Sequence, residues 1–299
     1  MDKKGLCIMA AAGMLGSSFD EASFYHAMEQ NPAMIGCDSG TTDSGPYFLG
    51  AGLARMHRKA AKRDLRLMIM EGLKRGIPVL IGSAGTAGAD PNVDWLVDIA
   101  REIAQEEALH FKLAEIKTEL TREQLLAYNK AGKITPLGKA EELSEKDIQQ
   151  VSRCVTAIGP EPFMKALEDG AQVVIAGRST DTSIYTAVPA MKGLDNAFAW
   201  HAAKVLECGS LASVFEIRHG AMLAWIREDS CSIAPGHPDM QASPVSVVSH
   251  TLYENADPFV LMEPGRDIYT KDSEYTAEDD RTVRVSKTTM ERRPYTVKL

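Results

Sequence analysis

The chain has 299 residues, of which 44% are apolar and 25% charged, a composition typical of one large α/β domain or of a main domain with a smaller appendage. Its formal net charge is −8 and no run of five basic residues occurs, so we expect no nucleic-acid partner. No run of about 18 apolar residues is present, so we expect no membrane partner and a cytoplasmic location.

The first third of the chain predicts a buried strand followed by a helical region. Residues 6–12 superficially resemble the apolar part of a signal peptide, but Gly13 and Gly16 follow at once, which favours a first strand and turn. From residue 47 to residue 70 apolar side chains recur at helical spacing, and the basic residues between positions 55 and 66 indicate a solvated helix face.

The next segment has the pattern of a βαβ unit. Residues 77–81 predict a strand, residues 82–88 a glycine-rich loop, residues 92–107 an amphipathic helix and residues 110–116 a second strand. Such a unit implies parallel pairing and a right-handed crossover.

Further elements follow in the same alternation. Ser144 and Asp147 form a capping-box pattern for a helix reaching residue 157. We expect later elements at these positions: a helix over 161–168 closing at Gly170, a strand over 171–176, a helix over 196–207, and a strand over 245–250.

We therefore predict an α/β fold with a mainly parallel sheet, helices on both faces and a small mixed C-terminal portion. A soft boundary separates an α/β main domain, residues 1–214, from a strand-rich portion, residues 215–299, where proline and serine increase. The last segment, residues 279–299, alternates like a strand with no partner after it, so we expect it to add to a sheet, pair across a dimer or fray.

Three loops rich in glycine and hydroxyl groups each follow a short apolar run. Because the strands of an open α/β sheet end together, these loops should converge on one crevice. The residues that we expect to bind substrate there are Asp38, Ser39, Thr41, Thr42, Gly82, Ser83, Gly85, Thr86, Gly88, Arg178, Ser179, Thr180 and Thr182.

The central loop, residues 82–88, has two interpretations that the sequence leaves open. Its glycines allow close approach of a phosphate or carboxylate to a helix N-terminus, or they pack the helix on the strand. The GxxGxxG spacing is not a dinucleotide fingerprint, and no Walker lysine follows. We expect neither NAD nor ATP as cofactor.

The first loop, residues 38–45, resembles the phosphate loop of actin-like sugar kinases. In those kinases, however, the loop belongs to a β-hairpin, whereas a helical pattern follows here. Clusters of Asp, Ser and Thr also form simple Asx and ST turns, and that interpretation stays open.

Two aspartates, Asp43 and Asp181, are the candidate catalytic residues. If they face one crevice, they can act as a general acid and base, or share a divalent cation such as magnesium; whether any metal is required stays open. Arg178 has the planar fork suited to a carboxylate or phosphate. Its alternative is an internal ion pair with Asp181 or Asp43.

The cysteines and histidines give weaker signals. Five scattered cysteines fit neither a disulfide framework nor a zinc site, so we expect free thiols. His201 and Glu207 lack the spacing of metal ligands on a helix. Cys208 lies at the negative end of that helix, which favours a packed thiol over a nucleophile.

Five ordered motifs, spread over about residues 30 to 270, resemble the acyclic terpene utilisation (AtuA-like) family. They are Gly36-Cys37-Asp38-Ser39-Gly40-Thr41-Thr42-Asp43-Ser44-Gly45-Pro46, Leu80-Ile81-Gly82-Ser83-Ala84-Gly85-Thr86-Ala87-Gly88, Glu161-Pro162-Phe163-Met164-Lys165-Ala166-Leu167, Gly177-Arg178-Ser179-Thr180-Asp181-Thr182 and the segment from His201 to Gly209. The family is named for gene clusters that degrade acyclic terpenes such as citronellol and geraniol, often near acyl-CoA enzymes. Its members are generally longer and often have a small companion domain or subunit, so the resemblance implies a fragment or a shortened member.

Together these observations predict an enzyme, or a catalytic subunit, that acts on a small-molecule acid or an acyl-CoA ester in acyclic terpene or branched-chain acid catabolism. Hydratase or lyase chemistry by proton transfer is the expected reaction. The alternative is a non-catalytic accessory subunit that binds the same metabolite and a partner protein. We expect a homo-oligomer or a complex with a small companion subunit.

Overall fold

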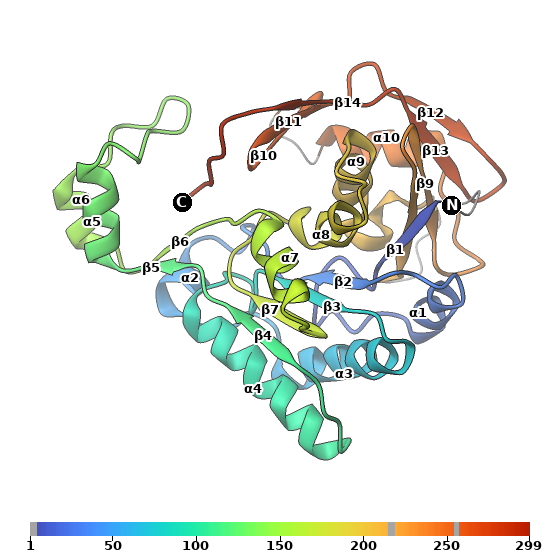
Figure 1. Ribbon diagram of the computed structural model, residues 1–299, viewed down its shortest axis with the longest axis horizontal. Coiled ribbons are helices and arrows are strands. Elements are labelled where there is room, and N and C mark those ends of the chain that lie inside the picture. The colour runs from blue at the N-terminus through green and yellow to red at the C-terminus, as the bar shows by residue number, and fades with distance from the viewer. Residues whose placement is uncertain (1–4, 215–218, 254–256) are drawn as a thin grey trace.

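A computed structural model describes residues 5–214, 219–253 and 257–299 of the chain. Its centre is a nine-stranded sheet in the order β12-β13-β9-β8-β1-β2-β3-β7-β4 (Figure 1). Five strands at one end of this order run parallel to one another: β1 (Leu6–Ala10), β2 (Ile35–Asp38), β3 (Val79–Gly82), β7 (Val173–Ala176) and β4 (Leu113–Ile116). The carboxyl ends of all five therefore lie along one edge.

The other half of the sheet is antiparallel and comes from the C-terminal part of the chain. It consists of β8 (Met222–Ile226), β9 (Ser230–Pro235), β13 (Val283–Ser286) and β12 (Glu274–Ala277). β8 pairs directly with β1, so the first strand of the chain joins the two halves.

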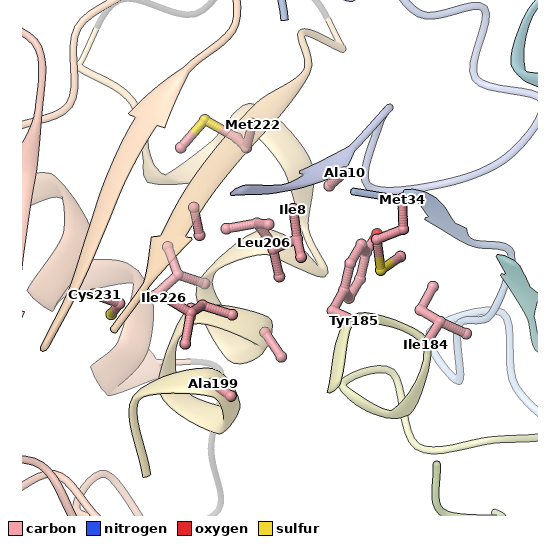
Figure 2. Packing of buried hydrophobic residues seen from close by; sticks show 14 of the residues in the cluster. Ile8, Ala10, Met34, Ile184, Tyr185, Ala199, Leu206, Met222, Ile226 and Cys231 are labelled. Carbon is pink, nitrogen blue, oxygen red and sulfur yellow. The ribbon is translucent and has the colours of Figure 1, made fainter. Parts of the chain in front are cut away.

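Successive residues of the strands pack into two hydrophobic clusters, as the period of a pleated strand requires. In β1, Cys7 and Met9 join one cluster, which also contains the apolar sides of α1 (Glu21–Met28), α3 (Arg58–Arg75) and α4 (Asp90–Glu106). Ile8 and Ala10 join the other, shown in Figure 2, with α7 (Glu161–Glu168), α8 (Ser183–Met191) and α9 (Ala197–Leu206).

Smaller units surround this framework. A two-stranded sheet of β5 (Glu119–Leu120) and β6 (Cys154–Val155) carries α5 (Arg122–Lys130) and α6 (Glu145–Gln150), which project from the body in Figure 1. A three-stranded antiparallel sheet has the order β10 (Val260–Glu263), β11 (Arg266–Tyr269), β14 (Thr289–Arg292). The remaining helices are α2 (Tyr47–Ala51), the 3₁₀ turn η1 (Gly209–Ala212) and α10 (Pro244–Tyr253).

The three-stranded sheet is held to the body by Arg266 of β11. Its guanidinium lies 4.3 Å from the ring centre of Trp200 in α9, and Nη1 donates to Oδ1 of Asp195 at 2.5 Å. Because Arg266 is almost completely buried, this contact fixes β10 and β11 against α9.

The structure confirms the predicted strands near residues 6–10, 79–82 and 173–176 and the helices over 161–168 and 197–206. The βαβ unit needs a correction, because β7 lies between β3 and β4 instead of leaving them paired. All four residues of β7 are buried, whereas those of β4 are partly exposed. The more apolar strand takes the inner position.

Two predicted helical regions have other limits than expected, and one predicted strand is a helix. The Ser144–Asp147 capping box forms, but its helix ends at Gln150, and residues 154–155 pair with β5. The helical region after residue 47 breaks at Gly52, whose φ is +65°, and resumes at Arg58 as α3.

Residues 245–250 form part of α10 rather than the predicted strand. Ser243 and Ser246 exchange hydrogen bonds between each hydroxyl and the other's backbone N–H, at 2.9 and 3.0 Å. Pro244 occupies the first helical position. This start signal outweighs the β-branched residues that follow.

The C-terminal segment adds to sheets, which is one of the three outcomes expected for it. β13 pairs with β9 and β12, and β14 pairs with β11. The backbone N–H of Ala157 also donates to the carbonyl of Lys298 at 2.9 Å. The predicted domain boundary at residue 215 lies outside the described residues.

The basic residues of α3 bridge to α4. Arg58 pairs with Glu102 at 2.7 Å, Lys62 with Glu106 at 2.7 Å, and Arg66 Nε with Glu107 at 3.1 Å. Their charge is thus matched by acids of the neighbouring helix. No helix among the described residues is both long and apolar enough to cross a membrane, and the described cysteines form no disulfide.

Candidate functional site

Three strand-end loops meet at the carboxyl edge of the parallel strands. The backbone N–H of Ser39, after β2, donates to the carbonyl of Gly82 at 3.1 Å, and that of Ser83 donates to Gly177, after β7, at 3.0 Å. The N–H of Thr41 donates to the carbonyl of Thr86 at 3.3 Å. The loops after β2, β3 and β7 are therefore neighbours.

The residues predicted to bind substrate or to act in catalysis differ in exposure. Those that are buried are Asp38, Ser39, Gly82, Ser83, Gly85, Thr86, Gly88, Ser179 and Thr182. Those that are half-buried are Thr41, Arg178, Thr180 and Asp181, and those that are exposed are Thr42 and Asp43.

Asp38 occupies the centre of this arrangement. Its Oδ2 accepts the N–H of Gly40 at 2.8 Å, while its Oδ1 is buried without a hydrogen-bond partner among the described residues. Burial, and secondarily the negative charge of Asp181, raises the pKa of Asp38 to about 7, although Arg178 acts in the opposite direction. A carboxyl group with this pKa can both give and take a proton near neutral pH.

Arg178 lies near two carboxyl groups, those of Asp181 and Asp38. Its Nη2 is 3.6 Å from Oδ1 of Asp181, and a Cβ atom on Gly40 would lie only 2.6 Å from its Nη1. The internal ion pair that the sequence allowed is present, but at a distance beyond a hydrogen bond. The guanidinium donates no hydrogen bond to an acceptor among the described residues, so its N–H groups remain available to an anion.

Two serines form the floor between the loops. The hydroxyl of Ser83 donates to the carbonyl of Ser179 at 3.3 Å and lies 3.4 Å from the Ser179 N–H. The hydroxyl of Ser179 has no partner among the described residues. A Cβ atom on Gly82 would lie 2.6 Å from that hydroxyl and 2.9 Å from Oδ1 of Asp38, so only glycine fits between them.

The glycine-rich loop after β3 uses most of its amides inside the protein. The N–H groups of Ser83, Ala84, Thr86 and Gly88 donate to backbone carbonyls, and Asn92 accepts the N–H of Ala89 at 3.2 Å. These contacts support the interpretation in which the loop packs the helix on the strand and supports the backbone of the β7 loop.

Asp43 lies apart from this centre. Its backbone N–H donates to the Thr41 hydroxyl at 3.1 Å, and its side chain is exposed, whereas that of Asp38 is buried. Neither aspartate borders the pocket described below. The structure therefore brings together Asp38, Arg178 and Asp181, and it leaves Asp43 on the outer part of its loop.

A pocket of about 210 Å³ opens next to the β7 loop. Residues 178–181 form one wall, and residues 260–263 of β10 form another. Lys204 and Glu207 of α9 also line it. Ala157, Asp257 and Lys298 complete the described lining.

Sequence reasoning missed five charged residues of this pocket: Lys204, Glu207, Asp257, Glu263 and Lys298. Lys204 donates to Glu207. Burial, and then the charge of Asp181, raises the pKa of Glu207, against the effect of Lys204. Burial also raises the pKa of Glu263, opposed by the hydroxyls of Thr180 and Thr182. A lysine and a glutamate three positions apart at the end of the apolar helix 197–206 could have indicated the first two of these residues.

The described residues contain no cluster of three or more His, Cys, Asp or Glu side chains arranged to hold a metal ion. Of the two aspartates considered as magnesium ligands, Asp181 borders the pocket and Asp43 does not. The geometry around them gives a metal centre no support.

Residues 51–216, just over half of the chain, match the family model described as "Acyclic terpene utilisation family protein AtuA". The matched span includes the loops after β3 and β7 and helix α9, whereas the loop containing Asp38 precedes it. No curated protein and no solved structure matches the chain.

Proposed function

The chain belongs to the acyclic terpene utilisation family AtuA, and from that premise we propose that it is an enzyme acting on a carboxylate or acyl-CoA intermediate of acyclic terpene breakdown. The observation that carries the proposal is the placement of Arg178 near Asp38 and Asp181 at the carboxyl edge of the sheet, with no hydrogen bond from its guanidinium to another described residue. Such an edge is where open α/β sheets bind ligands.

Arg178 holds the negative oxygen of the substrate in this proposal. Its guanidinium is planar, permanently charged and only 19% exposed at the side chain, so two parallel N–H groups can meet a carboxylate or a developing enolate oxygen. Thr180 and Ser179 stand beside it on the same pocket wall and supply hydroxyl groups.

The proposed reaction is the addition of water to a double bond conjugated with the carbonyl group, or its reversal. Asp181 takes a proton from water, and the resulting hydroxyl adds to the β carbon. Protonated Asp38, which does not itself border the pocket, gives its proton to the hydroxyl of Ser179, which does, and that hydroxyl gives its own proton to the α carbon. The balance is one water consumed and no oxidant required. Asp38 thereby takes the role that the sequence suggested for Asp43, because its buried position gives it a pKa near 7.

The test compares three variants with geranyl-CoA as the probe, by the loss of absorbance of its conjugated double bond. We expect Asp38→Asn to lower kcat by about 100-fold or more, the usual effect of losing a general acid or base. Asp43→Asn, on the same loop but exposed, serves as the matched control and should stay within about twofold of the unchanged protein.

Arg178→Lys should weaken the binding of geranic acid by about tenfold, since the charge stays but the two-pronged contact is lost. Loss of turnover in Asp43→Asn instead of Asp38→Asn would restore the original pair of Asp43 and Asp181. Binding without turnover by the unchanged protein would favour the alternative, a non-catalytic accessory subunit.

The proposal also covers the location of the protein in the cell and its oligomeric state. We place it in the cytoplasm, as a homo-oligomer or with a small companion subunit. The mass in solution, measured with and without the neighbouring gene products, tests this part separately.

A further inference from the structure

The pocket beside the β7 loop is bounded by the free edge of a strand. Four consecutive residues of β10, from 260 to 263, border it. Successive side chains of a strand point to opposite faces, so a run of four neighbours borders one pocket most directly where the backbone edge faces it. β10 is an outer strand of its sheet, and among the described residues only β11 pairs with it.

The register shows which backbone groups face the pocket. The N–H of Thr270 donates to the carbonyl of Phe259 at 2.9 Å, which makes these two residues a hydrogen-bonded pair of the β10–β11 ladder. Such pairs alternate along an antiparallel ladder. Leu261 and Glu263 therefore also point their backbone groups at β11, while Val260 and Met262 point theirs at the free edge.

A long ligand anchored at Arg178 can extend along this edge, because both border the same pocket. The pocket volume of about 210 Å³ holds a small acid or an acyl end but no coenzyme. At the rim stands Lys298, which borders the pocket, is exposed and forms no ion pair among the described residues. A cation at that place suits a ligand whose far end carries phosphate.

We propose that the free edge of β10 binds the pantetheine arm of a coenzyme A thioester, whose two secondary amides hydrogen-bond to the backbone of Val260 and Met262 as an added strand would. This inference rests on the proposed function and narrows its substrate from acids in general to thioesters. The acyl carbonyl lies at Arg178, the arm follows β10, and the phosphates lie toward Lys298.

The experiment uses Met262→Pro, which deletes the one N–H of that residue. Proline is tolerated on an edge strand where the N–H points away from the sheet, so the ladder with β11 should remain intact. Met262→Ala is the matched control, because it shortens the side chain and keeps the N–H. Binding of geranyl-CoA and of geranic acid is measured by calorimetry for each folded variant.

We expect Met262→Pro to weaken geranyl-CoA binding about fivefold, the usual effect of one lost hydrogen bond, and to leave geranic acid unchanged. Met262→Ala should change neither. A Met262→Pro protein that is folded and binds both ligands as before, or loses both equally, overturns the inference while the proposed function stands. If neither ligand binds the unchanged protein, the proposed function falls, and the inference with it.

Amide hydrogen exchange on the unchanged protein gives a second measurement that needs no folded proline variant. The amides of Val260 and Met262 should gain protection with geranyl-CoA and not with geranic acid. Protection that appears without ligand as protein concentration rises would show a second copy pairing with this edge, and would also overturn the inference.

Discussion

Lys204 and Glu207 form an ion pair one helical turn apart at the end of α9, a helix in which every residue from 197 to 206 is buried. Their side chains are only 11% and 4% exposed. Removing two charges from water costs several kcal/mol that their attraction seldom recovers in full. The position of the pair on the pocket wall, facing Asp181, therefore points to binding rather than to stability.

Lys204→Met should lower the free energy of unfolding by about 3 kcal/mol, since it leaves Glu207 buried without its counter-charge. The double variant Lys204→Met/Glu207→Leu should recover most of that loss and still fail to bind geranic acid. Urea denaturation and calorimetry measure the two effects. Lys165→Met, which breaks the exposed pair with Asp169, is the control and should cost little, because solvent screens that pair. An equal cost for the two variants would contradict the prediction.

Asp38 should make stability depend on pH. Its pKa in the folded protein is about 7, against an ordinary value of 3.8. The folded state therefore binds more protons between these values, and stability falls as pH rises from about 4 to about 7. Asp38→Asn should remove the part of this fall that Asp38 contributes and be about 2–4 kcal/mol more stable than the unchanged protein at pH 8.

Denaturation curves collected from pH 4 to pH 8 measure the pH effect of Asp38. Asp43→Asn should reproduce the curve of the unchanged protein at every pH. Parallel curves for Asp38→Asn and the unchanged protein would show that Asp38 titrates at its ordinary pKa.

Gly88 and Gly45 share a left-handed backbone, with φ of +72° and +70°, but differ in surroundings. A Cβ atom on Gly88 would lie 2.2 Å from the backbone nitrogen of Arg178, whereas on Gly45 it would meet nothing within 4 Å. Gly45→Ala should cost about 1 kcal/mol of unfolding free energy, the strain of the left-handed conformation alone. Gly88→Ala should cost about 3 kcal/mol or more and weaken geranic acid binding, because Arg178 must move. Equal stabilities would refute the packing interpretation of the loop.

Arg266 should stabilise the protein far more than another arginine of the same sheet. Arg266→Met loses the stack on Trp200 and the ion pair with Asp195, so we expect a cost of about 2–3 kcal/mol. Arg293→Met, whose side chain is 43% exposed beside Asp267, should cost much less, because solvent screens an exposed ion pair. Thermal unfolding of the two variants measures the difference. Similar melting temperatures would contradict the larger role of Arg266.

Local patterns predicted the parallel half of the fold, because strands such as Val173–Ala176 and loops such as residues 177–182 are specified by neighbouring residues. The position of β7 between β3 and β4 could not be predicted in the same way, since it depends on which strand buries more apolar surface. The prediction of a strand over Val245–His250 was wrong because the helix start signal at Ser243 competes with β-branched residues, and tertiary packing decides between them.

The candidate site also contains residues that local sequence patterns indicate and residues that only tertiary packing brings there. Asp38, Arg178 and Asp181 lie at strand ends and were visible in the sequence, although its pattern did not distinguish buried Asp38 from exposed Asp43. Glu263 reaches the β7 loop only because a distant sheet packs against α9. No local pattern carries that information.

The pairing of β1 with β8 has a consequence for how the chain folds during synthesis. Met9 has Leu223 as its partner, more than 200 positions later, and such distant contacts slow folding because a long loop must close first. During translation the β1 edge stays without its neighbour while the strands on its other side can already assemble. The nascent protein thus exposes an open sheet edge, a known hazard for aggregation, and ligand binding should be among the last properties it acquires.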